Sequence, residues 1–256
     1  MTRVITALLM VPLFLGVIIW GPHWAVVVLC VIVGCLCFHE FAGIADHHSL
    51  VLFRPFGFAF GVVGLLLPSS DPSFVLIALL LAMAASLRSG ELSAVLPRSG
   101  AMVAGVLYCF WPWRSALWLH QKNPLLLVFA LSVNWVGDTA AYYSGRFFGK
   151  RKMAPRVSPN KTWEGAVGSL AGSLLFGLVF LPHASSSGQA VEFTGLSVAA
   201  NLAGQIGDLV ESALKRGAGL KDSGSGLPGH GGWLDRVDAS LFALPVVHAW
   251  VAWRSW

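Results

Sequence analysis

The chain has 256 residues, of which 56% are hydrophobic and only 11% are charged, and its mean hydropathy is +0.71. Soluble domains carry about 25% charged residues, so a chain this apolar cannot cover its surface with polar groups and is predicted to be an integral membrane protein. The formal net charge of +5 does not indicate nucleic-acid binding, because the basic residues lie between apolar runs, where membrane topology explains them.

The apolar runs predict an all-α, polytopic membrane protein with about nine transmembrane helices. Helices are favoured because a chain in lipid must pair its own backbone groups, and the runs lack the alternation of barrel strands. The predicted spans are residues 4–20, 24–41, 51–67, 72–87, 99–113, 124–146, 163–182, 195–214 and 239–256. The first is expected to be a retained span rather than a signal peptide, since no small-residue cleavage site follows it. The fourth and fifth are short for a hydrocarbon core about 30 Å thick.

The distribution of Lys and Arg predicts the orientation of these spans. With the N-terminus in the cytoplasm, 14 of the 17 basic residues fall on the cytoplasmic side and only Arg114, Lys122 and Arg254 on the other. We therefore expect a multi-pass protein of the cell (inner, cytoplasmic) membrane. Residues 1–123 would form N-terminal transmembrane helices, and residues 124–256 would add the cytoplasmic catalytic loops to further helices, in one catalytic unit.

Among the acids inside predicted spans are Asp138, Asp208 and Glu211. An ionised side chain at membrane depth costs roughly 2.5–3.5 kcal/mol on insertion scales, so such residues usually have partners and face a polar interior. They belong to two stripes at helical spacing, which run toward two basic segments. The stripes are Asn134, Asp138 and Tyr142, and Asn201, Gln205, Asp208, Glu211 and Lys215. The alternative is a set of buried ion pairs that merely join helices.

The first basic segment, Arg146–Lys161, is followed by a predicted helix start. Turn-forming residues from Ser158 to Asn160 precede Lys161, and Thr162 is a suitable N-cap for a helix beginning at Trp163. A helix N-terminus beside a lysine favours an anion such as a triphosphate. The alternative is a basic loop that only sets topology or binds anionic headgroups.

The second basic segment, Lys215–Asp238, mixes glycines with both signs of charge. Glycines let the backbone approach a ligand closely, cations suit phosphate oxygens, and carboxylates suit a hard cation such as Mg²⁺. The glycines are Gly217, Gly219, Gly224, Gly226, Gly229, Gly231 and Gly232; the cations are Lys215, Arg216, Lys221 and Arg236; the acids are Asp222, Asp235 and Asp238. A plain flexible loop would not need this mixture.

The stretch Ser212–Asp238 resembles the signature of the phosphatidate cytidylyltransferase (CDP-diacylglycerol synthase) family. It matches S-x-x-K-R-x4-K-D-x-G-x3-P-G-H-G-G-x-x-D-R-x-D at every fixed position. The stretch Asp138–Gly165 is similar to an upstream segment of the same family, so the resemblance covers the second half of the chain. The first half resembles the family only in its apolar spans.

The resemblance implies that CTP and phosphatidate react to give CDP-diacylglycerol and pyrophosphate. It also implies a homodimer in the lipid bilayer and Mg²⁺ held by Asp208 and Asp235, and a second cation is left open. The site is expected at the cytoplasmic interface, where CTP and the lipid meet. The residues expected to act in catalysis are Asp208, Lys215, Arg216, Lys221, Asp222, His230, Asp235 and Arg236. Those expected to bind substrate are Asp138, Ser158, Asn160, Lys161, Thr162, Glu211, Gly231 and Gly232.

Three other functions fit parts of the sequence. A transporter would explain the intramembrane acids but not the glycine- and charge-rich segment. A related CTP-dependent enzyme could use another lipid, and a headgroup-binding scaffold would not need the full set of acids and cations. Two weaker metal sites, the Cys35–Cys37 pair and the group formed by His39, Glu40, Asp46, His47 and His48, are less favoured than packing roles.

Overall fold

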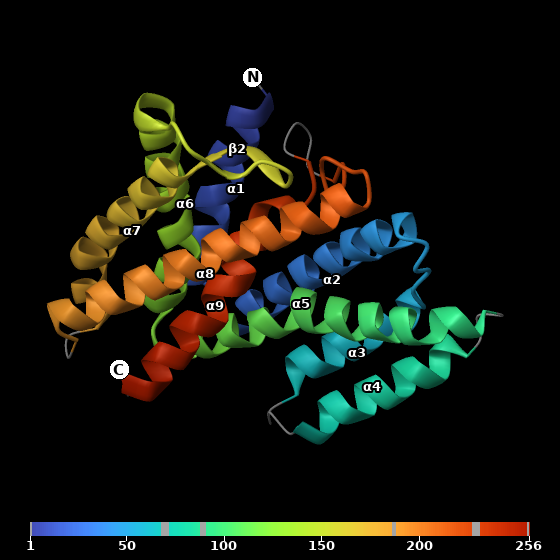
Figure 1. Ribbon diagram of the computed structural model, residues 1–256. Helices are drawn as coiled ribbons and strands as arrows, with labels where there is room; N and C mark the ends of the chain where they lie inside the picture. Colours follow the sequence, from blue (N-terminus) through green and yellow to red (C-terminus); the bar gives the residue numbers. More distant parts are fainter. Residues whose placement is uncertain (1, 68–71, 88–90, 186–187, 227–230, 255) are drawn as a thin grey trace.

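The computed structural model describes residues 2–67, 72–87, 91–185, 188–226, 231–254 and 256. Within these residues the chain forms nine α-helices, one short 3-10 helix and one β-hairpin (Figure 1). The helices are α1 (Thr2–Trp20), α2 (His23–His47), α3 (Arg54–Leu66), α4 (Pro72–Ser86), α5 (Val95–Lys122), α6 (Pro124–Phe148), α7 (Trp163–Ala184), α8 (Ala190–Gly217) and α9 (Leu234–Arg254). The 3-10 helix η1 is Leu92–Ala94, and the strands are β1 (Lys152–Ala154) and β2 (Ser158–Thr162).

The predicted all-α membrane fold is confirmed. Four helical segments are long and apolar enough to cross a membrane: α2, α6, α7 and the continuous stretch Leu92–Lys122 that joins η1 to α5. The segments Val11–Trp20, Arg54–Leu66 and Ser73–Ser86 are apolar but shorter. Length and composition therefore support four spans directly, and the total of nine stays a prediction.

Several predicted boundaries differ from the structure by five residues or more, among them the end of α2 and the start of α8, and two of the differences bear on the site. Helix α5 continues to Lys122 instead of ending at residue 113, because it tolerates Pro112 in its interior. Arg114, which looked like the polar end of a span, donates to the carbonyl of Gly64 at 2.6 Å. Helix α9 begins at Leu234 rather than residue 239, so Asp235 and Asp238 lie in its first turns and not in a loop.

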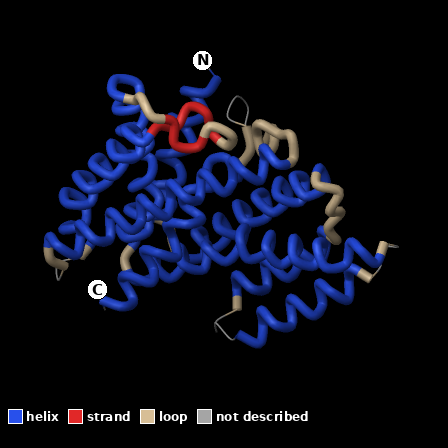
Figure 2. Tube along the Cα trace, viewed as in Figure 1, coloured by secondary structure: helices blue, strands red, loops and turns tan. Residues whose placement is uncertain are grey.

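The hairpin β1–β2 was not predicted (red in Figure 2). Its strands pair antiparallel, with Lys152 opposite Thr162 and Ala154 opposite Ser158. Because Trp163 begins α7 directly after β2, the hairpin fixes the segment before the helix in an extended form. The basic segment between α6 and α7 is therefore a short ordered structure rather than an open loop.

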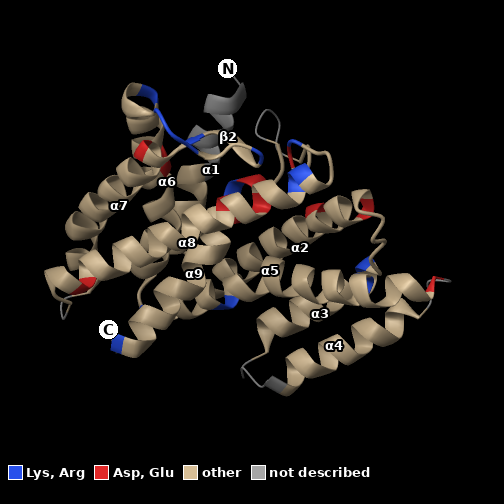
Figure 3. Ribbon diagram, viewed as in Figure 1, with Lys and Arg blue, Asp and Glu red and all other residues tan. Residues whose placement is uncertain are grey.

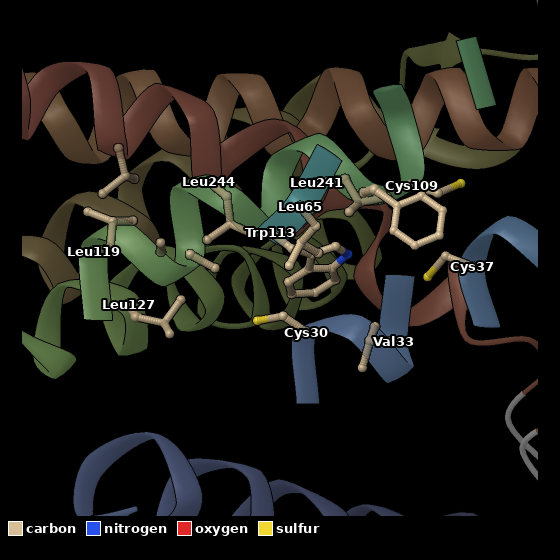
Figure 4. Close-up of a cluster of buried hydrophobic side chains, with 14 of the residues drawn as sticks. Cys30, Val33, Cys37, Leu65, Cys109, Trp113, Leu119, Leu127, Leu241 and Leu244 are labelled. Carbon is tan, nitrogen blue, oxygen red and sulfur yellow. The ribbon is translucent and has the colours of Figure 1, made fainter. Parts of the chain in front are cut away.

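Helices α6 to α9 pack as neighbours along the chain, and α5 lies among α2, α3, α4 and α9. Small residues let α6 and α7 approach closely, since a side chain at Gly168 or Gly172 would meet Ala140 or Ser144 of α6. The apolar core joins both halves of the chain (Figure 4). There Cys30, Cys37 and Cys109 are buried free thiols, and the burial of Cys37 agrees with the packing role expected for it.

Polar contacts gather at two ends of the bundle. We call the end that holds the C-terminal ends of α2, α6 and α8 and the first turns of α7 and α9 the charged end; Figure 3 shows most Lys, Arg, Asp and Glu there. His48 bonds the carbonyl of Leu214 across it. At the opposite end Asn123 donates to the carbonyl of Ala184 at 2.8 Å, and Arg254 pairs with Glu192.

Candidate functional site

Thr162 and Lys161 connect the hairpin to two helices. The side chain of Thr162 accepts from the backbone N–H of Gly165 at 3.1 Å, which confirms the predicted N-cap of α7. Lys161, the residue before it, forms an ion pair with Asp208 of α8. Both side chains are half-buried, at 26% and 29% exposure, so water and solutes still reach the pair.

A polar cavity of about 420 Å³ opens beside this ion pair, between α6, α7 and β2. Asp138 lies in it, close enough to Asp208 and Lys161 for their charges to interact. The chemistry of its walls is mixed, with cations, hydroxyls, amides and one carboxylate. The lining residues that carry these groups are Asp138, Tyr142, Arg146, Asn160, Lys161, Thr162, Ser169 and Gln205.

The polar stripe of α8 continues below this cavity. Gln205 donates to the side-chain oxygen of Asn201 at 2.7 Å, and Asn201 donates to Ser169 and Ser173 of α7 at 3.0 and 2.8 Å. These bonds satisfy the buried amide of Asn201 and the partly buried amide of Gln205. The first part of the stripe therefore joins helices, and its continuation through Asp208, Glu211 and Lys215 carries the charges.

Lys215 is the centre of a second charged group at the end of α8. It pairs with Glu211, at 2.6 Å from Oε2, and with Asp235 of α9. Glu211 is fully buried, so Lys215 compensates two carboxylates that could not stand alone in this surrounding. The ion pair with Asp235 thereby connects the start of α9 to the end of α8.

Asp235 is held by more than this lysine. Its Oδ2 accepts from the backbone N–H of Gly232 at 2.8 Å and from the N–H of Ser223 at 3.0 Å, and it lies 3.0 Å from the Ser223 hydroxyl oxygen. Gly231 has φ of +79°, a conformation that favours glycine, and a side chain there would meet Asp235. The glycines of the segment thus let the chain wrap closely around one carboxylate.

Three cations of the signature segment carry no ion pair within the described residues: Arg216, Lys221 and Arg236, all exposed. Arg216 donates to the carbonyls of Val157 and Leu220 at 3.4 and 3.2 Å, so it links the hairpin to α8. Lys221 and Arg236 are available to an anion that comes from outside the chain.

A second cavity, about 330 Å³ and almost entirely apolar, reaches Arg236 from the other side of α9. It lies between α1, α2, α5, α6 and α9. Apolar side chains such as Val33, Trp113 and Leu131 line it, and Ser240 and Arg236 are its polar members. A cation at the edge of an apolar cavity suits an amphiphile with an anionic head.

Sequence reasoning missed Glu40 of α2, which it treated as part of a weak metal group. Glu40 is 7% exposed and accepts from the hydroxyl of Ser223 at 2.8 Å and from the backbone N–H groups of Trp233 and Leu234 at 2.9 and 2.8 Å. The position of Glu40 within an apolar span was a signal that could have found it, since a carboxylate there needs a partner. The sequence could not show that the partner lies almost two hundred residues further along the chain.

The structure brings most of the predicted site residues together at the charged end, in two neighbouring groups. Asp138, Asn160, Lys161 and Thr162 line the polar cavity, Asp208 pairs with Lys161, and Ser158 is at the start of the adjoining strand. Glu211, Lys215, Asp222, Gly231, Gly232 and Asp235 surround the start of α9. Asp238 lies close enough to Asp208, Asp138 and Lys215 for their charges to interact, so it connects the groups. His230 lies outside the described residues.

Comparison with known proteins identifies the family to which this charged end belongs. The model of the cytidylyltransferase family matches residues 1–253. The chain belongs to the cytidylyltransferase family. A protein of Brucella suis biovar 1 (strain 1330) named phosphatidate cytidylyltransferase is 35% identical over 257 aligned residues, which cover 96% of this chain and 91% of the relative. Proteins of the same name from Haemophilus influenzae and Staphylococcus aureus (strain COL) are each 44% identical, over 56% and 48% of this chain and 50% and 47% of their own lengths.

This cytidylyltransferase matches the family model along nearly its whole length, including the first half, in which the sequence offered only apolar spans. The bonds of Glu40 give one physical reason why that half belongs to the same unit.

Proposed function

We propose that this cytidylyltransferase transfers the cytidylyl group of CTP to phosphatidate, giving CDP-diacylglycerol and pyrophosphate for phospholipid biosynthesis. One observation carries the proposal: the charged end holds both a cavity lined by Arg146 and Lys161, beside the ion pair with Asp208, and an apolar cavity that reaches Arg236 at the start of α9. A water-soluble polyanion and a lipid phosphate could approach such a place from opposite directions. The relatives named phosphatidate cytidylyltransferase support the same pair of substrates.

The reaction requires the enzyme mainly to position the two substrates and to supply positive charge. A phosphate oxygen of phosphatidate attacks the α-phosphorus of CTP, and the bond to the β-phosphate breaks to release pyrophosphate. The nucleophile is already anionic, so no Ser, Cys or His nucleophile is needed. Cations must hold two polyanions together and stabilise the leaving charge. Lys161, at the polar cavity, and the exposed Lys221 and Arg216 are proposed to bind CTP phosphates.

Arg236 is proposed to bind the phosphate of phosphatidate, because it is the charged member of the apolar cavity. One acyl chain would then lie among the side chains of α1, α2, α5 and α6. The arrangement explains why two adjacent residues of the signature have different roles, since Asp235 faces Lys215 and the loop, whereas Arg236 reaches the cavity. Two adjacent positions in the first turn of α9 would thus serve different substrates, with Asp235 on the polar side and Arg236 at the cavity proposed for the lipid.

The carboxylates fit a magnesium ion by their donor chemistry. An ionised carboxylate has about four lone-pair sites, and Asp208 uses one oxygen for Ser212 at 3.3 Å and the other for Lys161. Oδ2 of Asp235 accepts from two backbone N–H groups and Oδ1 pairs with Lys215, so Oδ1 retains a lone pair for a metal ion. We propose Asp208 and Asp235 as ligands of Mg²⁺, which would supply charge compensation for the phosphates. Within the described residues no three His, Cys, Asp or Glu side chains are grouped as a ready metal site.

We propose a multi-pass protein of the inner membrane whose charged end faces the cytoplasm. The bias of basic residues supports this orientation, since Arg54, Lys161 and Lys215 lie at the charged end and Lys122 and Arg254 at the opposite end. The family resemblance also supports a homodimer. The mass of the purified particle, against 27.3 kDa for one chain, would test the dimer separately.

The test is a reaction of the purified protein in detergent with labelled CTP, phosphatidate and Mg²⁺. We expect a labelled liponucleotide and one pyrophosphate per product, and neither when phosphatidate is omitted. If labelled CTP reacts only with a different lipid, the substrate assignment is wrong. If reconstituted vesicles instead accumulate a solute and form no liponucleotide, the chain is a transporter.

A further inference from the structure

The starting point is the burial of Glu40 between two parts of the chain that are far apart in sequence. Its carboxylate lies at the C-terminal part of α2 and accepts from Ser223, Trp233 and Leu234. A buried carboxylate is costly unless its oxygens are bonded. Within the described residues these bonds are the only polar contacts between α2 and the start of α9. The loop and the helix start therefore supply the donors that the buried carboxylate of Glu40 requires.

The bonds form a pattern along three successive backbone N–H groups. Gly232 donates to Asp235, and Trp233 and Leu234 donate to Glu40. N–H groups at the start of a helix form an anion site, which here holds carboxylates of the protein itself. The same groups are therefore not free for a substrate phosphate, and the first turn of α9 is set by Glu40.

Ser223 connects Glu40 with Asp235. Its hydroxyl lies 2.8 Å from Oε2 of Glu40 and 3.0 Å from Oδ2 of Asp235, while its N–H donates to Asp235. Glu40 also explains why glycine stands at two positions, because a side chain at Gly224 or Gly232 would meet its carboxylate. The position of Asp235 thus depends on Glu40 through both the loop and the helix start.

We propose that Glu40 is a positioning residue for cytidylyl transfer: it fixes Ser223 and the first turn of α9, and thereby aims Asp235 at Lys215. The proposal rests on the proposed function for its catalytic meaning, and it assigns a role to the N-terminal half of the chain. Glu40 lines neither cavity, although Trp233, one of its three donors, lines the apolar one, and Glu40 is not placed on a substrate. Its effect should reach the reaction through Ser223, the first turn of α9 and Asp235.

The experiment compares Glu40→Gln, Ser223→Ala and the double variant, with Glu192→Gln as a matched control. Glu192 is also a buried carboxylate, but it lies at the opposite end of the bundle. A glutamine retains one oxygen and adds donors, so it cannot accept all three bonds of Glu40. We expect Glu40→Gln to lower kcat by about 10- to 100-fold, as for residues that orient a functional group, and Ser223→Ala to lower it less. The control should keep its kcat.

Two further readouts separate positioning from a general structural role. The double variant should lose little more kcat than Glu40→Gln alone, because both changes act through the same contacts to Asp235. Amide exchange at Ser223 and Gly232–Leu234 should become faster in Glu40→Gln and stay unchanged in Glu192→Gln. Folding of each variant is checked by its thermal transition in detergent.

A folded Glu40→Gln with the kcat of the parent protein, or losses that simply add in the double variant, would overturn the proposal. Unchanged amide exchange would do so as well. If Glu40→Gln does not fold, Ser223→Ala decides by the same measurements. If the parent protein forms no liponucleotide, the proposed function fails, and amide exchange still judges the contact itself.

Discussion

The two ends of the helix bundle use buried acids and cations in different ways. At the opposite end, Glu192 accepts from the N–H of Gln189 at 3.1 Å and from Trp256 at 3.2 Å, and it pairs with Arg254. Its oxygens are used within one capping arrangement at the start of α8. At the charged end, four aspartates and Glu211 lie close to only two lysines, Lys161 and Lys215, whereas Lys221 and Arg236 have no acid partner within the described part of the chain.

The difference shows how to separate structural from functional charge in this membrane protein. The hydrogen bonds and the ion pair of Glu192 satisfy its carboxylate, so a structural role accounts for this residue. A group whose acids retain open lone pairs and whose cations face cavities is incomplete until ligands join it. The comparison predicts that equivalent substitutions at the two ends will have unequal effects on activity.

Asp235→Asn should have the largest effect on activity. The amide keeps one oxygen, so it can accept from the N–H groups of Ser223 and Gly232 only by turning its NH2 toward Lys215, which is left with one carboxylate. We expect kcat/KM to fall by about 100- to 1,000-fold, as when one stabilising group of a polar site is lost. Steady-state kinetics on protein of verified thermal stability would measure it. A loss below tenfold would place Asp235 outside the reaction centre.

Arg236→Gln should affect one substrate selectively. Because Arg236 lies at the apolar cavity, we expect the KM for phosphatidate to rise by about tenfold, as for one charged hydrogen bond, while the KM for CTP stays the same. Arg254→Gln is the matched change at the opposite end and should alter neither. An equal rise in both constants would contradict separate binding of the lipid phosphate.

Leu131→Trp should have a smaller and chain-length-dependent effect. The larger side chain would fill part of the apolar cavity and compete with an acyl chain. We expect the KM for long-chain phosphatidate to rise by about tenfold or less, and that for a short-chain phosphatidate to change little. Leu175→Trp, on an exposed face of α7, is the control. Equal effects on both lipids would show that the cavity does not hold the chain.

Glu192→Gln should have the smallest effect on the reaction. Its partner Arg254 is 42% exposed, so solvent weakens the ion pair. We expect the melting temperature to fall by about 2–4 °C and kcat to remain that of the parent protein. Differential scanning in detergent and the labelled CTP assay measure the two quantities. A large loss of kcat would remove the distinction between the two ends.

The sequence predicted the helices well because a membrane span depends on the local composition of the chain. It also predicted the N-cap at Thr162, the polar stripe of α8 and the gathering of the charged residues at one end. The resemblance to a cytidylyltransferase family was confirmed. These features depend on spacing within one helix or on a contiguous motif.

The failures concern features that depend on distant contacts. The start of α9 was placed too late because its first turn is polar, and that turn is held by Glu40 from α2. The hairpin depends on pairing between two short basic stretches that carry no apolar alternation. The lysine partners of Asp208 and Asp235 could be guessed by charge, but which lysine meets which acid is set by helix packing.

The most direct test of the central claim is a comparison of Asp208→Asn with Glu192→Gln in the labelled CTP assay, on protein of matched purity and melting behaviour. The charged end is claimed to be the place of cytidylyl transfer, so Asp208→Asn should form almost no labelled liponucleotide while Glu192→Gln forms as much as the parent protein. Equal product from Asp208→Asn and the parent protein would contradict the claim.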